Sequence, residues 1–271
     1  MDTLTENTGL YTDYYELTMA QGYFLSSKEN EQTVFDYYYR TNPYEGGYLI
    51  FAGLQDLLQI LKNFSYSKEN IEFLKKTGLK DEFLEYLKDF KFTATVYSMK
   101  EGEIVFPNEP LVRVEGNIIE AQLIETLLLN YLNFQSLIAT KACRIRNVIG
   151  DKDFADFGLR RAQGLGGIHA SRAAVIGGAN TTSNVYSAFN YDIPLTGTQA
   201  HAWIQSLDYE LESFRRYDEI NPDSTVLLVG TYKTLKAGVP NAIIVAKEIE
   251  EKGYKMIGIR WDSGDLAYLS K

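Results

Sequence analysis

The chain has 271 residues, a formal net charge of -9 and 45% hydrophobic residues, which supplies a buried core and excludes a disordered chain. The acidic balance argues against nucleic acid and anionic membranes as partners. The residues up to Asn7 show no secretory signal, and no run approaches the roughly 18 apolar residues of a membrane span, so we expect a cytoplasmic location. Cys143 is the single cysteine, which excludes an internal disulfide and a cysteine metal knuckle.

The first 117 residues mix helical and strand patterns. Helices are predicted over residues 10–25, 54–61, 68–76 and 81–89, and strands over 33–40, 92–98 and 111–115. Thr12 and Asp13 are typical of a cap before the first helix, and Pro43 closes the first strand. We therefore expect an α+β amino-terminal domain over residues 1–117.

The pattern changes in the remaining part, residues 118–271. Residues 118–148 are mostly apolar at helical spacing and predict one or two bridging helices. Short apolar strands then alternate with Gly- or Ser-rich turns and helices, and these strands are expected over residues 154–159, 193–196, 225–229 and 256–260. This order is typical of an α/β fold with a parallel sheet. A closed (β/α) barrel usually needs about 250 residues, so we expect only the first part of a barrel here, truncated and with an open sheet edge.

The most informative run is Gly197-Thr198-Gln199-Ala200-His201. His201 stands at the start of a predicted helix, where unpaired backbone N–H groups and the helix dipole disfavour imidazolium and favour bound anions. This position predicts a neutral nucleophile or base beside a phosphate site. The alternative is an ordinary helix residue hydrogen-bonded to a neighbouring carbonyl.

Polar residues gather at successive strand ends, where α/β barrels place their chemistry. In chain order these are Arg160-Arg161, the turn 177–184, Thr198 with His201, Thr231-Tyr232, and the run 260–265. Arginine forks bind phosphate or carboxylate, small turns present backbone N–H groups, and acidic groups hold ribose hydroxyls or magnesium. Each cluster alone also has an ordinary interpretation as a surface pair, a turn or a helix cap. Together they predict a site for an anionic sugar phosphate.

Several longer runs then identify a family. They are Leu10–Ala20, Phe106–Pro110, Asn133–Gln135, Ala139–Ala142, Asp156–Gly164, Thr182–Val185, Gly197–His201, Gly238–Ala242 and Asp262–Asp265. Across its whole length the sequence resembles nicotinate phosphoribosyltransferase, a type II phosphoribosyltransferase. The resemblance implies an α+β amino-terminal domain followed by a (β/α) barrel of that kind.

The resemblance also implies an activity. Nicotinate and phosphoribosyl pyrophosphate would give nicotinate mononucleotide and pyrophosphate, coupled to ATP hydrolysis and assisted by Mg²⁺, in NAD salvage by a homodimer. By position, His201 would be the phosphorylated histidine, and Tyr15 would reach the pyridine ring of nicotinate across the dimer interface. Thr198 and Arg160 would contact nicotinate, and Arg260 and Asp262 would bind the phosphoribosyl group. No protein metal ligands are expected.

Two departures from the family leave alternatives open. The resemblance leads us to expect Val-Asp-Thr-Tyr-Asp-Thr where this chain has Val229-Gly230-Thr231-Tyr232-Lys233-Thr234, and Gly230 cannot supply a carboxylate to the histidine. The chain also ends at Lys271, where the family is expected to continue. One alternative is therefore an impaired, truncated copy that binds only a ligand or a full-length relative. Another is a related transferase acting on nicotinamide or quinolinate.

Overall fold

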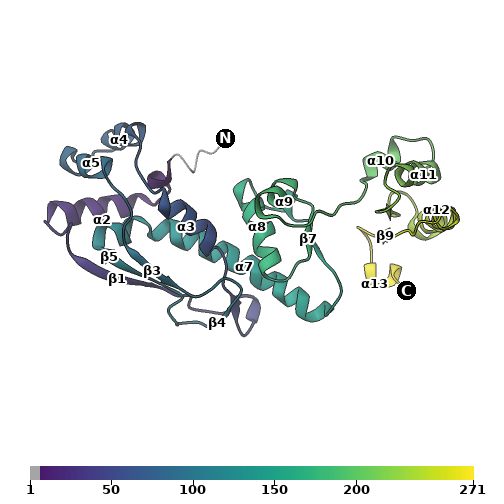
Figure 1. Ribbon diagram of the computed structural model, residues 1–271, viewed down its shortest axis with the longest axis horizontal. Coiled ribbons are helices and arrows are strands. Elements are labelled where there is room, and N and C mark those ends of the chain that lie inside the picture. The colour runs from purple at the N-terminus through teal and green to yellow at the C-terminus, as the bar shows by residue number, and fades with distance from the viewer. Residues whose placement is uncertain (1–6) are drawn as a thin grey trace. The chain divides into compact units, whose positions relative to one another are not determined.

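The structure is a computed structural model in which residues 7–271 are described (Figure 1). Residues 1–6, part of the segment in which no secretory signal is expected, lie outside the described residues. The chain divides into two compact units, Met1–Leu195 (unit 1) and Thr196–Lys271 (unit 2). Each unit is described by itself.

Unit 1 contains a three-stranded antiparallel sheet with the strand order β1-β5-β3. Its strands are β1 (Gln32–Tyr37), β3 (Thr95–Ser98) and β5 (Val112–Asn117). A second antiparallel pair joins β2 (Leu49–Ile50) to β4 (Ile104–Val105). The three longer strands confirm the sequence prediction, whereas β2 and β4 were not predicted because two residues are too short for a periodic pattern.

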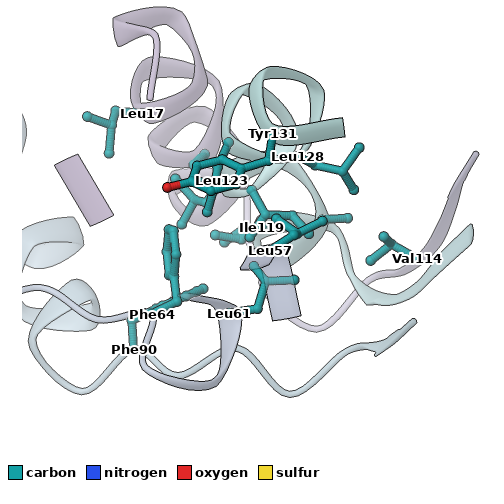
Figure 2. Packing of buried hydrophobic residues seen from close by; sticks show 14 of the residues in the cluster. Leu17, Leu57, Leu61, Phe64, Phe90, Val114, Ile119, Leu123, Leu128 and Tyr131 are labelled. Atoms are coloured by element: carbon teal, nitrogen blue, oxygen red, sulfur yellow. The ribbon is translucent and has the colours of Figure 1, made fainter. Parts of the chain in front are cut away.

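Short helices pack against one another and close the core of unit 1. They are α2 (Tyr14–Leu25), α3 (Leu54–Lys62), α4 (Lys68–Lys75) and α5 (Asp81–Lys88), with 3₁₀ turns η1 (Thr8–Leu10) and η2 (Pro43–Glu45). All four α-helices were predicted from their spacing. The leucine stripe of α3 buries Leu57 and Leu61 in the cluster drawn in Figure 2.

The apolar segment predicted to bridge the chain forms two helices, α6 (Ile118–Leu123) and α7 (Glu125–Ile149). The side-chain oxygen of Asn117 caps α6 by accepting from the backbone N–H of Ile119 at 2.8 Å. Gly150, with a φ of 61°, ends α7 in a conformation that favours glycine. Among residues 7–271, no helix combines the length and the apolar character needed to cross a membrane.

After α7, unit 1 contains a parallel β-α-β element. Its strands β6 (Ala155–Asp156) and β7 (Thr181–Thr182) are joined through η3 (Leu159–Arg161) and α8 (Leu165–Ile176), and α9 (Val185–Tyr191) follows. The predicted strand over 193–196 is wrong in extent, because only a bridge between Leu195 and Thr182 forms. Pro194 has no N–H to donate, although its carbonyl accepts from the Thr182 N–H at 3.1 Å.

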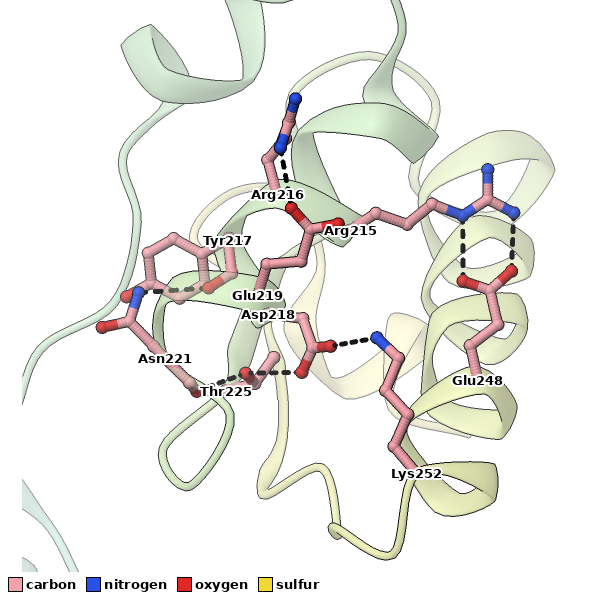
Figure 3. Close-up of polar contacts among 9 residues, drawn as sticks. All are labelled: Arg215, Arg216, Tyr217, Asp218, Glu219, Asn221, Thr225, Glu248 and Lys252. Carbon is pink, nitrogen blue, oxygen red and sulfur yellow. Dashed lines mark hydrogen bonds and ion pairs between the residues drawn. The ribbon is translucent and has the colours of Figure 1, made fainter.

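Unit 2 contains a second parallel pair, β8 (Val226–Leu228) and β9 (Gly258–Arg260). The helices α10 (His201–Gln205) and α11 (Glu210–Ile220) precede β8 in the chain. The π-helical turn η4 (Thr234–Gly238) and α12 (Val239–Glu251) connect β8 to β9, and α13 (Leu266–Leu269) follows β9. Phe214 and the apolar strand β8 lie at the centre of a small core. Figure 3 shows that polar contacts link α11 to α12, including the Arg215–Glu248 ion pair.

Candidate functional site

The parallel register of unit 2 brings the loops that follow β8 and β9 to one sheet edge. Leu228 pairs with Arg260, and the backbone N–H of Val229 donates to the Arg260 carbonyl at 3.2 Å. The loops that follow the two strands therefore leave the sheet side by side, which places Thr231 and Asp262 near each other. This is the edge where α/β proteins position their reactive groups.

His201 is held between these two loops. It is the first residue of α10, as predicted. Its Nδ1 lies 3.0 Å from the Thr231 hydroxyl, and its Nε2 lies 2.9 Å from Oδ2 of Asp262. About 44% of the His201 side chain is exposed, so the ring is fixed by polar partners and is still reachable from solvent.

Arg260 completes the cluster around Asp262. Its guanidinium lies 3.3 Å from Oδ2 of Asp262 through Nη2, and it donates through Nη1 to the hydroxyl of Thr198. The carboxylate thus sits between an imidazole and a guanidinium, with 23% of its side chain exposed. Hydrogen bonds involving charged groups are stronger than neutral ones, so the pair orders both side chains.

Four of the six predicted site residues therefore come together in unit 2: Thr198, His201, Arg260 and Asp262. Thr231, which the sequence placed only among strand-end residues, is the contact that sequence reasoning missed. Its signal was its position just after the apolar strand over 225–229. The alternative of an ordinary helix residue bonded to a neighbouring carbonyl does not fit, because both ring nitrogens of His201 contact side chains instead.

Arg160 lies in unit 1, on the short turn η3. The turn is anchored by Asp156, whose Oδ1 accepts from the Gly158 N–H at 2.9 Å and whose Oδ2 accepts from Ser171 and Thr182 at 2.7 and 3.1 Å. A Cβ on Gly158 would lie 2.8 Å from Oδ1 of Asp156, so the backbone can approach the carboxylate this closely only at glycine. The Asp-Phe-Gly run thereby fixes the loop that carries Arg160.

Tyr15 also lies in unit 1, near the start of α2, and half of its surface is exposed. A hydrogen bond to the Glu16 carboxylate, together with desolvation, raises the pKa of Tyr15 to about 12, so the hydroxyl stays protonated at neutral pH. Within the described part of unit 1, no hydrogen bond or ion pair joins the side chains of Tyr15 and Arg160. The two residues stand on separate elements.

Across the described residues, no group of three or more His, Cys, Asp or Glu side chains is arranged to hold a metal ion. Magnesium commonly binds through substrate phosphates with only one or two protein carboxylates.

The parallel β-α-β elements, with the polar cluster of Thr198, His201, Arg260 and Asp262 at the strand ends of unit 2, define the class of the structure as α/β. The structure is similar to human nicotinic acid phosphoribosyltransferase, with a TM-score of 0.86 and 30% identity over 94% of this chain and 61% of that one. It also shares its fold with a nicotinate-nucleotide pyrophosphorylase from Pyrococcus furiosus, at a TM-score of 0.78 and 22% identity, covering 97% of this chain and 59% of that one. The expected fold class is confirmed.

The sequence comparisons define the family. Residues 10–133 match the nicotinate phosphoribosyltransferase amino-terminal domain, and residues 153–270 match the nicotinate phosphoribosyltransferase family. A nicotinate phosphoribosyltransferase of Bacillus subtilis is 47% identical over 98% of this chain and 54% of its own length, and one of Dictyostelium discoideum is 41% identical over 97% and 52%. The chain belongs to the nicotinate phosphoribosyltransferase family. It spans about half the length of the curated relatives it matches.

Proposed function

We propose that this chain provides the phosphoryl-accepting and phosphoribosyl-binding part of a nicotinate phosphoribosyltransferase of NAD salvage. The reaction joins nicotinate to phosphoribosyl pyrophosphate, hydrolyses ATP and releases nicotinate mononucleotide and pyrophosphate. Both phosphorylated substrates are expected to arrive as Mg²⁺ complexes. One observation carries the proposal: in a chain of this family, His201, Asp262, Arg260 and Thr198 form a single hydrogen-bonded cluster.

The proposed chemistry requires little proton transfer at nicotinate. The pyridine nitrogen is already a nucleophile, so the protein has to stabilise an oxocarbenium-like sugar and a leaving pyrophosphate. Arg260 supplies positive charge for phosphate, and the Asp262 carboxylate suits sugar hydroxyls. His201 offers an exposed imidazole to accept a phosphoryl group from ATP.

The residues proposed to contact nicotinate are Thr198, Arg160 and Tyr15. The guanidinium of Arg160 has the geometry to bind the nicotinate carboxylate through two parallel hydrogen bonds. The half-exposed ring of Tyr15 provides an aromatic face for the pyridine ring. Competition binding with nicotinate, nicotinamide and quinolinate tests this selectivity, and preference for either of the latter two would contradict it.

Phosphoryl transfer to His201 is the first test. The purified chain is incubated with ATP labelled at the γ-phosphate, and acid-labile label on the protein is measured. Label is expected on the wild type and on His169→Ala, which serves as the matched control because the chain has two histidines. Equal labelling of His201→Ala would contradict the assignment.

A homodimer in which Tyr15 acts on the partner's site is proposed as well. Chains carrying Tyr15→Ala are mixed with chains carrying His201→Ala after each is shown to be inactive. If Tyr15 acts across the interface, half of the dimers are mixed and each holds one intact site, so about a quarter of the wild-type activity returns. No recovery, or a monomer in light scattering, contradicts the arrangement.

The second candidate function is ligand binding without turnover. Gly230 and Lys233 favour it, because both stand where the family resemblance predicts an acidic residue. Nicotinate mononucleotide formation from nicotinate, phosphoribosyl pyrophosphate and ATP distinguishes the two candidates, with the Bacillus subtilis relative as the positive control. Binding of phosphoribosyl pyrophosphate with no product and no label on His201 would favour this candidate.

A further inference from the structure

The side chain that holds His201 has to be identified in this chain, because Gly230 offers none. A Cβ placed on Gly230 would lie 3.2 Å from Oδ1 of Asp262 and 3.9 Å from the Ser263 hydroxyl. The space beside residue 230 is therefore already occupied by the carboxylate of Asp262. A second carboxylate at residue 230 would face a like charge.

The strand register explains why Asp262 reaches this place. Leu228 of β8 pairs with Arg260 of β9, so residues 230 and 262 each stand two positions beyond the same rung of the parallel ladder. The 3.2 Å hydrogen bond from the Val229 N–H to the Arg260 carbonyl extends the alignment past the strands. Positions 230 and 262 are therefore equivalent relative to the two strands, and the backbone of either position would place a carboxylate near His201.

The hydrogen bonds around the imidazole define its tautomer. An ionised carboxylate only accepts hydrogen bonds, so the 2.9 Å contact with Oδ2 of Asp262 requires a proton on Nε2 of His201. In the neutral ring the lone pair then lies on Nδ1, which accepts from the Thr231 hydroxyl at 3.0 Å. Nη2 of Arg260 lies 3.3 Å from the same oxygen, Oδ2 of Asp262, and so holds the carboxylate that contacts His201.

We infer that Asp262 is the positioning residue for His201 in this chain, that it fixes the Nε2–H tautomer together with Thr231, and that residue 230 is not needed for this role. Asp262 would thereby position the His201 ring in addition to binding the sugar hydroxyls of the substrate. The inference gains its catalytic meaning from the proposed function, but the geometry on which it rests does not depend on turnover. With this inference Gly230 no longer favours ligand binding without turnover, and of the two departures in this run only Lys233 does.

The decisive test is ¹⁵N NMR of the chain with labelled imidazole rings, recorded well above about pH 6.5, the ordinary pKa of imidazole. The two histidines give separate signals, assigned with His169→Ala and His201→Ala. The wild type is expected to show His201 as the Nε2–H tautomer. Asp262→Ala is expected to give a mixture of tautomers, with the His169 signals unchanged as the control for folding.

Two further variants keep the test decisive. Asp262→Asn preserves size and is used if the alanine variant does not fold; its amide also donates, so the tautomer preference is again expected to weaken. Gly230→Asp is expected to leave the His201 tautomer as it is. A wild-type Nδ1–H tautomer, or unchanged His201 signals in the folded Asp262 variants, would overturn the inference.

Phosphoryl labelling adds a functional readout. Removing a group that orients a reactive histidine typically costs about 10- to 100-fold in rate, which is expected for Asp262→Ala. Gly230→Asp is expected to bring no gain, whereas a tenfold gain or more, about 1.4 kcal/mol, would overturn the inference. If no variant is labelled and the NMR result holds, the proposed function fails while the positioning role stands.

Discussion

Unit 1 and unit 2 differ in the size of their hydrophobic cores and in how far their charged side chains are buried. In the described part of the chain, the largest core cluster of unit 1 contains 28 buried apolar side chains, whereas that of unit 2 contains eight. Among its described residues, unit 1 combines a largely buried ion pair, Arg172–Glu101 at 2.6 Å, with exposed pairs such as Lys28–Glu31. Unit 2 has exposed ion pairs such as Arg215–Glu248, a pair between the buried Asp218 and the exposed Lys252, and a central cluster around an exposed imidazole.

The difference shows what each region can tolerate. A large core distributes the cost of a change over many contacts, while a small one depends on a few side chains. The polar cluster around His201 in unit 2 is positioned mainly by two short parallel strands and their register. We therefore expect unit 2 to be the less stable unit and the one whose unfolding removes the site.

The largest expected effect follows from truncating one buried ring in each unit. Phe83 and Phe214 are both completely buried, and Phe→Ala in a core typically costs about 3–5 kcal/mol. Phe214→Ala is expected to unfold unit 2 at lower denaturant than unit 1, because its core has so few members. Both tryptophans, Trp203 and Trp261, lie in unit 2, so their fluorescence reports that unit while circular dichroism reports the whole chain.

A single unfolding transition with both probes in Phe214→Ala would contradict the comparison. Phe83→Ala is the matched control, since the same atoms are removed from the larger core. It is expected to shift the circular dichroism transition and to leave the midpoint reported by tryptophan fluorescence nearly unchanged.

The next effect concerns the buried ion pair of unit 1. Arg172 donates to both carboxylate oxygens of Glu101, at 2.8 and 2.6 Å, and to Oε1 of Gln55 at 2.7 Å. Arg172→Met leaves the Glu101 charge buried without its partner and is expected to cost about 3 kcal/mol in urea unfolding. The Arg215–Glu248 pair of Figure 3 is the surface control. Arg215→Met is expected to leave the unfolding midpoint unchanged, and equal losses would remove the distinction between the units.

Most helices and the longer strands of unit 1 could be predicted from the sequence, because they depend on patterns within one segment. The leucine stripe of α3 and the apolar run of α6 and α7 are such patterns. The two-residue strands β2, β4 and β7 were not predicted as strands, because hydrogen bonds to distant segments define them. The same limit applies to the site. His201, Arg260 and Asp262 were predicted individually as site residues. The 2.9 Å contact between Nε2 of His201 and Oδ2 of Asp262, 61 positions apart, was not predicted, because it depends on the β8–β9 register.

A smaller effect is expected when the pH falls, through His169 of unit 1. Burial lowers the pKa of His169, and the nearby Arg172 charge lowers it further, against an opposing contribution from Asp56. The unfolded chain therefore binds this proton first, and stability is lost as the pH falls from about 6.5 through the lower folded pKa. His169→Gln is expected to flatten this part of the stability profile in urea unfolding, and an equally steep profile would contradict it.

The smallest effect on stability is expected when the pH rises, through the carboxyl group of Glu16 in α2. Burial raises the pKa of this carboxyl, partly offset by hydrogen bonds from Gln122 and Thr126. A raised folded pKa means that the native state holds the proton longer, so stability is present at acid pH and is lost as the pH rises through that pKa. Glu16→Gln keeps an acceptor without the charge and is expected to raise the urea midpoint slightly at neutral pH. Because Glu16 lies in unit 1, the midpoint reported by tryptophan fluorescence should stay in place; a shift there instead would show that the two units do not unfold independently.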